Sequence, residues 1–201
     1  MSNLSIFLDY QILDHLFRIG NKTYEGKRKH ELALTELRKK AEKQMVNIWM
    51  SEITKVEMIH GKNNPRINEA KRCLARTNDQ KKTAIAKTMN IKWLTYPCSK
   101  FDDNYSLFDV SARFSGPEWN EANTFEKWLL NIKGVSPGDA RQVVSCIYGS
   151  DVNALDKKPV IKWFLTEDSA LRSALINVKS KSKISELSQM KISSVSGFVN
   201  K

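Results

Sequence analysis

The segment Ile6-Phe7-Leu8-Asp9 is a short apolar run that ends in a carboxylate. Residues 4–8 predict a buried β-strand, and apolar residues at helical spacing between positions 12 and 17 predict a helix directly after it. A carboxylate that follows three apolar residues is expected to lose part of its hydration, which is costly unless the group has a partner. Asp9 is therefore the first residue of the chain for which we expect a specific role.

Strand-to-helix transitions of the same kind recur along the rest of the chain. Residues 45–50, 91–96 and 160–165 predict three further strands, and residues 190–195 predict a fifth at the edge of the sheet. Helices are predicted between them, at residues 27–43, 64–90, 121–132, 136–148 and 169–176. Strands that alternate with helices predict an α/β fold with three layers, α/β/α, around a central, mainly parallel sheet of four or five strands.

The composition indicates one globular domain that spans residues 1–201. Hydrophobic residues make up 41% of the chain, which is enough for a substantial core. The sequence contains no apolar run of about 18 residues that could span a bilayer, and no signal peptide at its N-terminus. Cys73, Cys98 and Cys146 are far apart and odd in number, as expected for free thiols in a reducing compartment. We therefore expect a cytoplasmic protein without a membrane partner.

The net charge of +11 narrows the expected partners. The positive excess is concentrated in residues 1–90, although part of it belongs to a solvated helix face near residues 36–43, where Lys and Glu alternate. An excess of this size favours a polyanionic partner such as a nucleic acid. The chain has no GxGxxG, P-loop or GxSxG motif, which disfavours nucleotide-cofactor enzymes and common serine hydrolases. Its histidines and cysteines lack the spacing of a zinc site.

Four carboxylates each lie where a predicted strand gives way to a helix. They are Asp9, Glu57, Asp139 and Asp168. In an open parallel sheet the carboxyl ends of the strands converge on one crevice, so we expect these acids to lie close together. Their mutual repulsion would be costly without a hard cation such as Mg²⁺ or Mn²⁺. An acidic pocket in a basic protein suggests metal-assisted cleavage of a nucleic acid.

Three of these acids also have an ordinary structural explanation. Asp139 follows Ser136 by three residues, in a capping-box pattern. Asp168 could cap the helix that begins at Ser169. Glu57 could be a solvated helix residue paired with a neighbouring lysine. Asp9 is the acid for which such an explanation is hardest to find.

Short motifs surround the four acids and follow one another in a fixed order. They are Leu8-Asp9-Tyr10-Gln11-Ile12-Leu13, the helix positions Ser51, Thr54 and Glu57, the segment Pro137-Gly138-Asp139-Ala140, and Leu165-Thr166-Glu167-Asp168. This ordered set resembles the PIN-domain family of metal-dependent nucleases, which includes the ribonuclease toxins of toxin–antitoxin pairs. The family has a strand ending in Asp, a Ser-x-x-Thr-x-x-Glu helix, a Pro-x-Asp-Ala helix start and a Leu-Thr-x-Asp strand end. Together the four motifs span residues 4–175.

The resemblance implies a Mg²⁺- or Mn²⁺-dependent endoribonuclease that cleaves RNA phosphodiester bonds with metal-activated water. It implies that the catalytic and metal-binding residues are Asp9, Glu57, Asp139 and Asp168, supported by Gln11 and Thr166. The chain departs from the family at Tyr10-Gln11, where a small hydroxyl residue and Asn are usual, and in a longer step from Asp139 to Asp168. Extra segments are expected near residues 20–45, 98–120 and 149–159.

RNA is the expected partner. If the chain is a toxin, a cognate antitoxin protein is a second expected partner. The sequence leaves open whether the chain forms a homodimer. Tyr10 and Arg141 are candidate nucleic-acid-binding residues, because each lies beside one of the acids. We expect Trp49, Trp128 and Trp163 to be core residues. Two alternatives remain: a PIN-like nucleic-acid-binding or scaffold protein that has lost catalysis, and a metal-dependent phosphatase or phosphotransferase. The Asp-x-Asp expected of a haloacid-dehalogenase-type enzyme is missing after the first strand.

Overall fold

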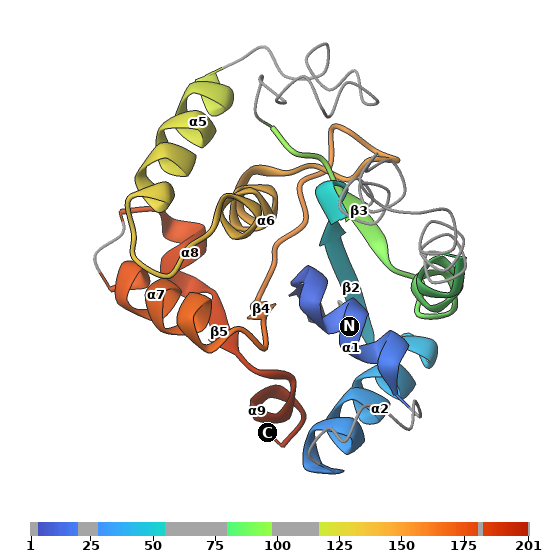
Figure 1. Cartoon of the computed structure of the whole chain (residues 1–201). Helices are drawn as coiled ribbons and strands as arrows, with labels where there is room; N and C mark the ends of the chain where they lie inside the picture. The colour runs from blue at the N-terminus through green and yellow to red at the C-terminus, as the bar shows by residue number, and fades with distance from the viewer. Residues whose placement is uncertain (1–3, 20–27, 55–79, 98–116, 181–182, 201) are drawn as a thin grey trace, which may run out of the picture.

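A five-stranded, all-parallel sheet forms the centre of the molecule (Figure 1). The computed structural model describes residues 4–19, 28–54, 80–97, 117–180 and 183–200. The strands stand in the order β3-β2-β1-β4-β5. Their bounds are β1 Leu4–Leu8, β2 Val46–Ser51, β3 Lys92–Leu94, β4 Trp163–Leu165 and β5 Lys191–Ser193. The sequence prediction of an α/β fold around a parallel sheet is thus confirmed.

Helices cover both faces of this sheet, so the fold has three layers (Figure 1). One layer, called the α1–α2 layer below, consists of α1 (Tyr10–Arg18), α2 (Arg28–Glu42), the helical residues 80–88 and α9 (Val195–Val199). The other, called the α5–α8 layer, consists of α5 (Pro117–Leu130), α6 (Pro137–Tyr148), α7 (Ser169–Lys179) and α8 (Ser185–Gln189). Each layer packs on its own hydrophobic cluster, as expected for a parallel sheet buried on both faces.

The side chains of β1 alternate between these two clusters. Ile6 and Leu8 pack with the α1–α2 layer, whereas Phe7 packs with the α5–α8 layer and stacks on Phe164 of β4 at a ring-centroid distance of 5.2 Å. All four side chains are almost completely buried. Because side chains two residues apart point to the same face of a strand, the residue after β1 continues this alternation. Asp9 therefore lies on the side of Phe7, toward the α5–α8 layer.

The structure differs from the sequence prediction mainly at element ends. β3 and β4 have three residues each and are shorter than predicted, and the short helices α8 and α9 were not predicted. The predicted extra loop at residues 149–159 is irregular and runs beside β3, where Thr95 N donates to Ser150 O and Val152 N donates to Trp93 O. Of the predicted helix at 64–90, residues 80–88 are helical, and most of the remainder lies outside the described residues.

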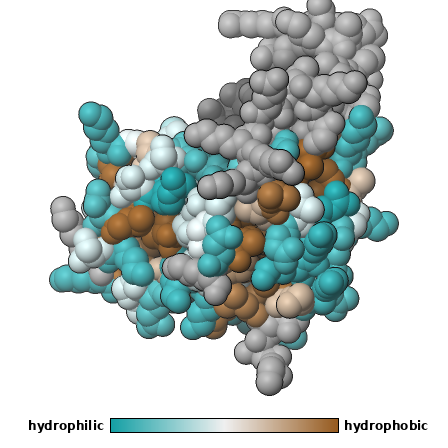
Figure 2. All heavy atoms as spheres, turned by 90° about the horizontal axis from the view of Figure 1, so that it is seen from below, coloured by the Kyte–Doolittle hydropathy of each residue, from teal (hydrophilic) through white to brown (hydrophobic). Residues whose placement is uncertain are grey.

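The surface is largely hydrophilic. Seen from below, hydrophobic residues emerge on it in separate patches (Figure 2). Exposed large hydrophobic side chains are found on several elements, among them Leu32 on α2, Leu130 on α5 and Ile176 on α7. None of the described helices is long and apolar enough to cross a membrane.

Candidate functional site

Asp9 lies at the carboxyl edge of the sheet, between the ends of two neighbouring strands. Its backbone N–H donates to Leu165 O of β4 at 3.0 Å, which continues the pairing of β1 with β4. The chain leaves β1 through α1 on one face of the sheet and leaves β4 through α7 on the other face. In doubly wound folds, such a change of face between neighbouring strands is the position at which ligands bind. The chain thus places a carboxylate at that position.

Asp9 also occupies the N-cap position of α1, but its side chain makes no capping hydrogen bond. The carboxylate is buried, with 2% of the residue exposed, and its Oδ2 accepts a 2.7 Å hydrogen bond from Thr166 Oγ1. Thr166 Oγ1 in turn accepts from Asp168 N at 3.1 Å. Thr166, which is completely buried, therefore connects the strand end that carries Asp9 to the turn that carries Asp168. Thr166 thus forms the hydrogen bond to a carboxylate that the sequence predicts, whereas its support of a metal site stays a prediction.

Burial raises the pKa of the Asp9 carboxyl to about 6, from an ordinary value of 3.8. The negative charges of Asp139 and Asp168 raise this pKa further, while hydrogen bonds from Thr166 and from the backbone of Tyr10 oppose the rise. Asp168 lies near Asp9, because Thr166 Oγ1 bonds both to Asp9 Oδ2 and to Asp168 N. Asp139 is close enough for its charge to act on Asp9. The structure therefore links Asp9 and Asp168 through Thr166 and leaves Asp139 within range of electrostatic interaction with Asp9. The fourth, Glu57, lies outside the described residues.

Asp168 is the N-cap of α7. Its Oδ1 accepts from the backbone N–H groups of Ala170 and Leu171, at 2.8 and 2.9 Å. Its Oδ2 lies 3.5 Å from Gln11 Nε2, which donates to it from α1. The capping role suggested by the sequence is confirmed, and Gln11 contacts Asp168 through the oxygen that does not cap the helix. Arg172, one turn further along α7, donates from Nη1 to Thr166 O at 2.9 Å, a contact that no sequence pattern indicated.

Asp139 belongs to a complete capping box at the start of α6. Its Oδ2 accepts from Ser136 N at 2.8 Å, and its own N–H donates to Ser136 Oγ at 3.2 Å. The capping-box explanation is therefore confirmed. The N-terminus of a helix carries partial positive charge, so α6 and α7 both direct positive ends toward the acids. These two helix ends offset part of the repulsion between the carboxylates.

Two buried hydrogen-bonded pairs hold α6 against the end of β2. Ser51 Oγ and Ser145 Oγ are 2.7 Å apart, and Gln142 Nε2 donates to Thr54 Oγ1 at 3.0 Å. Ser51 Oγ also accepts from Ile53 N at 3.2 Å, which fits its predicted role at a helix start. Ser51 and Thr54 belong to the motif that includes Glu57, whereas the α6 partners Gln142 and Ser145 were not predicted. The partners of these two pairs are separated by 94 and 88 positions in the sequence, so no local pattern predicts the pairing.

The two candidate nucleic-acid-binding residues have partners within the chain. The Tyr10 hydroxyl accepts from Lys82 Nζ at 3.0 Å, and Lys82 also forms a 2.6 Å ion pair with Asp14. Arg141 Nε approaches Glu126 of α5 at 3.8 Å. Burial alone would lower the pKa of Lys82, but the hydrogen bonds to Asp14 and Tyr10 outweigh it and raise that pKa. Contact of Tyr10 or Arg141 with nucleic acid thus remains a prediction.

Three tryptophans were expected to be buried in the core, and two of them are. Trp49 and Trp163 are 6% and 7% exposed, as expected for strand residues. Trp128 is 39% exposed, so its assignment to the core is wrong. The apolar positions Phe125 and Leu129 turn inward on α5, and Trp128 lies beside them at the edge of the buried stripe.

The described acids offer carboxylate oxygens, the type of ligand that a hydrated divalent cation takes. Among the residues that the structure describes, no three His, Cys, Asp or Glu side chains form a group that could hold a metal ion directly. Mg²⁺, however, keeps several of its waters and binds proteins through only one or two carboxylates. Asp9 with Asp139 or Asp168 offers carboxylate oxygens of this kind.

Comparisons with family models, with curated proteins and with solved structures give no match to this chain. The resemblance to PIN domains therefore rests on the four motifs and their order.

Proposed function

We propose that this chain is a Mg²⁺- or Mn²⁺-dependent endoribonuclease of the PIN type, with its active site at the carboxyl ends of β1 and β4. The observation that carries the proposal is Asp9: a buried carboxylate at a helix start that caps nothing and lies near two further acids. Such a group is unfavourable in a folded protein unless a cation or a proton compensates it. The net charge of +11 supports a polyanionic substrate.

The described residues would divide the work of such a site. Asp9 would bind the cation, together with the oxygens of Asp139 and Asp168 that do not cap α6 and α7. Thr166 orients Asp9 through its hydroxyl, and Gln11 holds the free oxygen of Asp168. When bound, the ion would supply an activated water and would stabilise the developing charge of a phosphodiester. Glu57, which lies outside the described residues, would complete the set as the resemblance implies.

The proposed toxin role has a cognate antitoxin as its partner and is a narrower proposal than nuclease activity. The runner-up is a nucleic-acid-binding protein of the same fold that has lost catalysis. One feature of the site favours it: the capping bonds of Asp139 and Asp168 each occupy a carboxylate oxygen. Both proposals expect the protein to bind RNA, but only the nuclease proposal expects it to cleave RNA.

The decisive experiment measures RNA cleavage with variants that separate charge from capping. Asn caps a helix as well as Asp does, so Asp168→Asn keeps the cap of α7 and removes the charge. We expect full-length protein to cleave a labelled RNA in Mg²⁺ or Mn²⁺ and not in EDTA. Asp9→Asn and Asp168→Asn should each lose at least about a hundredfold in rate, on the scale of a lost transition-state contact. Asp156→Asn, at an exposed position, is the matched control.

Equal cleavage in EDTA, or by the Asp9→Asn variant, would overturn the nuclease proposal. RNA binding without cleavage under every metal condition would instead support the catalytically inactive alternative.

A further inference from the structure

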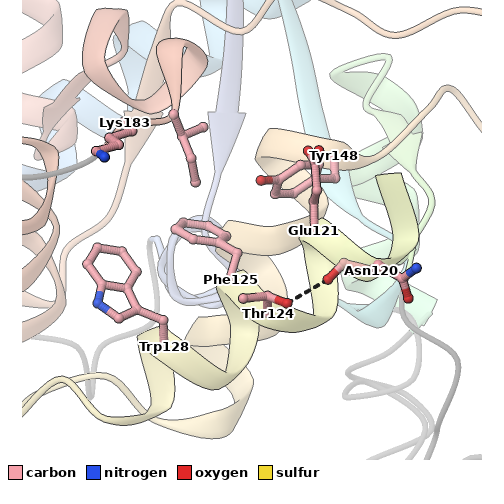
Figure 3. A pocket seen from close by; sticks show the side chains of 8 residues that line it. Asn120, Glu121, Thr124, Phe125, Trp128, Tyr148 and Lys183 are labelled. Atoms are coloured by element: carbon pink, nitrogen blue, oxygen red, sulfur yellow. Dashed lines mark hydrogen bonds between the residues drawn. The ribbon is translucent and has the colours of Figure 1, made fainter. Parts of the chain in front are cut away.

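An open pocket on the surface, of about 630 Å³, lies outside the acidic site, between α5, the end of α6 and the start of α8. Its volume is within the range of ligand-binding pockets. Three aromatic residues line it, together with one lysine and a few polar groups (Figure 3). The lining residues are Asn120, Glu121, Thr124, Phe125, Trp128, Tyr148, Lys183 and Ile184. The acid chemistry described above uses none of them.

The aromatic residues form a supported platform. Phe125 contacts both of the others, with ring-centroid distances of 5.6 Å to Trp128 and 5.9 Å to Tyr148. Phe125 and Tyr148 are 4% and 9% exposed and belong to the core. Trp128 is 39% exposed, so its indole presents a free surface on a rigid base. An indole fixed in this way loses little entropy when a flat ring stacks on it.

Charged side chains of both signs lie beside the platform, since Lys183 and Glu121 both line the pocket. In Figure 3, Lys183 extends near Trp128 at one end of the pocket, while Asn120, Glu121 and Tyr148 lie at the other. Lys158 Nζ stands 5.4 Å from the centroid of the Tyr148 ring, and it also pairs with Glu186 at 3.6 Å. Aromatic surfaces combined with lysines are the elements with which proteins bind single-stranded nucleic acids. Glu121 can accept hydrogen bonds from base amino groups, a role that carboxylates have in base recognition.

We propose that this pocket binds an unpaired base of a single-stranded nucleic acid, with the base stacked on Trp128 and the adjoining phosphate near Lys183. As a substrate subsite, this rests on the proposed nuclease function. Helix α6 runs from Asp139, at the acidic site, to Tyr148, at the pocket. Nine residues at about 1.5 Å per residue separate them by roughly 13 Å along the helix axis. A short single strand can span this distance and reach both the acidic site and the pocket.

The test compares two oligonucleotides on the full-length protein in EDTA, where metal-dependent cleavage is absent. One is a labelled 12-nucleotide RNA, and the other carries the same backbone with every base removed. Fluorescence anisotropy at a fixed salt concentration gives the affinity for each, since phosphate contacts depend on salt. The variants are Trp128→Ala and Trp128→Phe, with Leu130→Ala as the control at another exposed apolar position of α5.

Trp128→Ala should weaken binding of the base-containing RNA about tenfold and leave binding of the abasic strand unchanged, since it removes stacking and no charge. Trp128→Phe should retain most of the affinity, and Leu130→Ala all of it. Lys183→Glu, an exposed change independent of the aromatic platform, should weaken binding of both strands and reduce the salt dependence. The melting temperature of each variant reports whether it is folded.

The proposal is overturned if Trp128→Ala binds the base-containing RNA as wild type does, or if it loses equal affinity for both strands. Loss of self-association in Trp128→Ala with unchanged RNA binding would likewise overturn it, because the pocket would then bind a protein segment. If base binding depends on Trp128 but the wild type cleaves no RNA with Mg²⁺ or Mn²⁺, the pocket stands and the nuclease proposal fails. If the wild type cleaves RNA and Trp128→Ala binds RNA as wild type does, the nuclease proposal stands and the pocket proposal fails.

Discussion

Replacing Asp9 with Asn should change how the stability of the metal-free protein depends on pH. The pKa of Asp9 is about 6 in the folded protein, against an ordinary value of 3.8. Between these two values the folded state binds more protons than the unfolded chain. The stabilisation from the protonated carboxyl is therefore fully present below about pH 3.8 and is lost as the pH rises through about 6.

The size of the effect follows from the difference in pKa. At about 1.36 kcal/mol per pKa unit, the rise to about 6 corresponds to roughly 3 kcal/mol. Little of this should be screened by water, since Asp9 is 2% exposed. Asn at this position carries no charge at any of these pH values, and its side-chain oxygen can still accept from Thr166. Wild type should therefore lose about 3 kcal/mol relative to Asp9→Asn between pH 3.5 and pH 7.5.

Urea unfolding in EDTA at a series of pH values gives this difference directly. Every other titrating group is common to the two proteins, so its contribution cancels in the comparison. Asp156→Asn serves as the control and should follow the wild-type profile. Adding Mg²⁺ at pH 7.5 should raise the stability of wild type but not of Asp9→Asn, since a ligand stabilises only the state that binds it. Parallel pH profiles for wild type and Asp9→Asn would refute the desolvated carboxylate on which the proposed site depends.

Three further substitutions test contacts around the site, each by urea unfolding. Thr166→Val removes the hydroxyl that bonds to Asp9 and to the backbone of Asp168, and it should lower the free energy of unfolding by about 2 kcal/mol. An unchanged free energy of unfolding would contradict these two hydrogen bonds. Lys82→Met removes the ion pair with Asp14 and should cost roughly 2 kcal/mol, less than a fully buried pair because Asp14 is partly exposed, while Lys81→Met at the exposed neighbour should cost little. Gly149→Ala would bring a Cβ against two backbone oxygens, one of α6 and one of the segment after β3, and it should lower the free energy of unfolding by about 2 kcal/mol. An unchanged urea midpoint would contradict this close approach.

The sequence predicts the fold well because each strand carries its own signal. β1 is an uninterrupted apolar run that ends at a carboxylate, and both features depend only on neighbouring residues. The start of α6 was predicted from Ser136, Pro137 and Asp139 because a capping box is a local pattern. β3 ends at Leu94, opposite the last residue of β2, whereas β4 begins only at Trp163 although its partner β1 begins at Leu4. A single segment does not encode where pairing with its neighbour begins or ends.

The candidate site was predicted only in part, because local patterns can be read from the sequence whereas contacts between distant segments cannot. The positions of Asp9 and Asp168 follow from strand ends, and their proximity follows from the parallel sheet. The contacts that position them depend on pairs distant in sequence, such as Gln142 with Thr54, and on helix rotations that no local pattern fixes. Trp128 illustrates the second point. Its helical spacing resembles that of a core residue, but α5 is rotated so that Phe125 and Leu129 fill the interface and Trp128 reaches the surface.

Capping explains two of the three described acids and leaves the third. Asp139 and Asp168 each use one oxygen to satisfy the first turn of a helix, which would justify both residues in a protein without any metal. Asp9 stands at an equivalent position before α1 and caps nothing. Its carboxylate is instead buried, where hydrogen bonds from the Thr166 hydroxyl and the Tyr10 backbone stabilise it and the negative charges of the other two acids oppose it. A residue that serves only stability would not be ionised there, since neutral Asn would make the same hydrogen bond without the repulsion. The placement of Asp9 is thus the feature that structural roles leave unexplained and that a bound cation would account for.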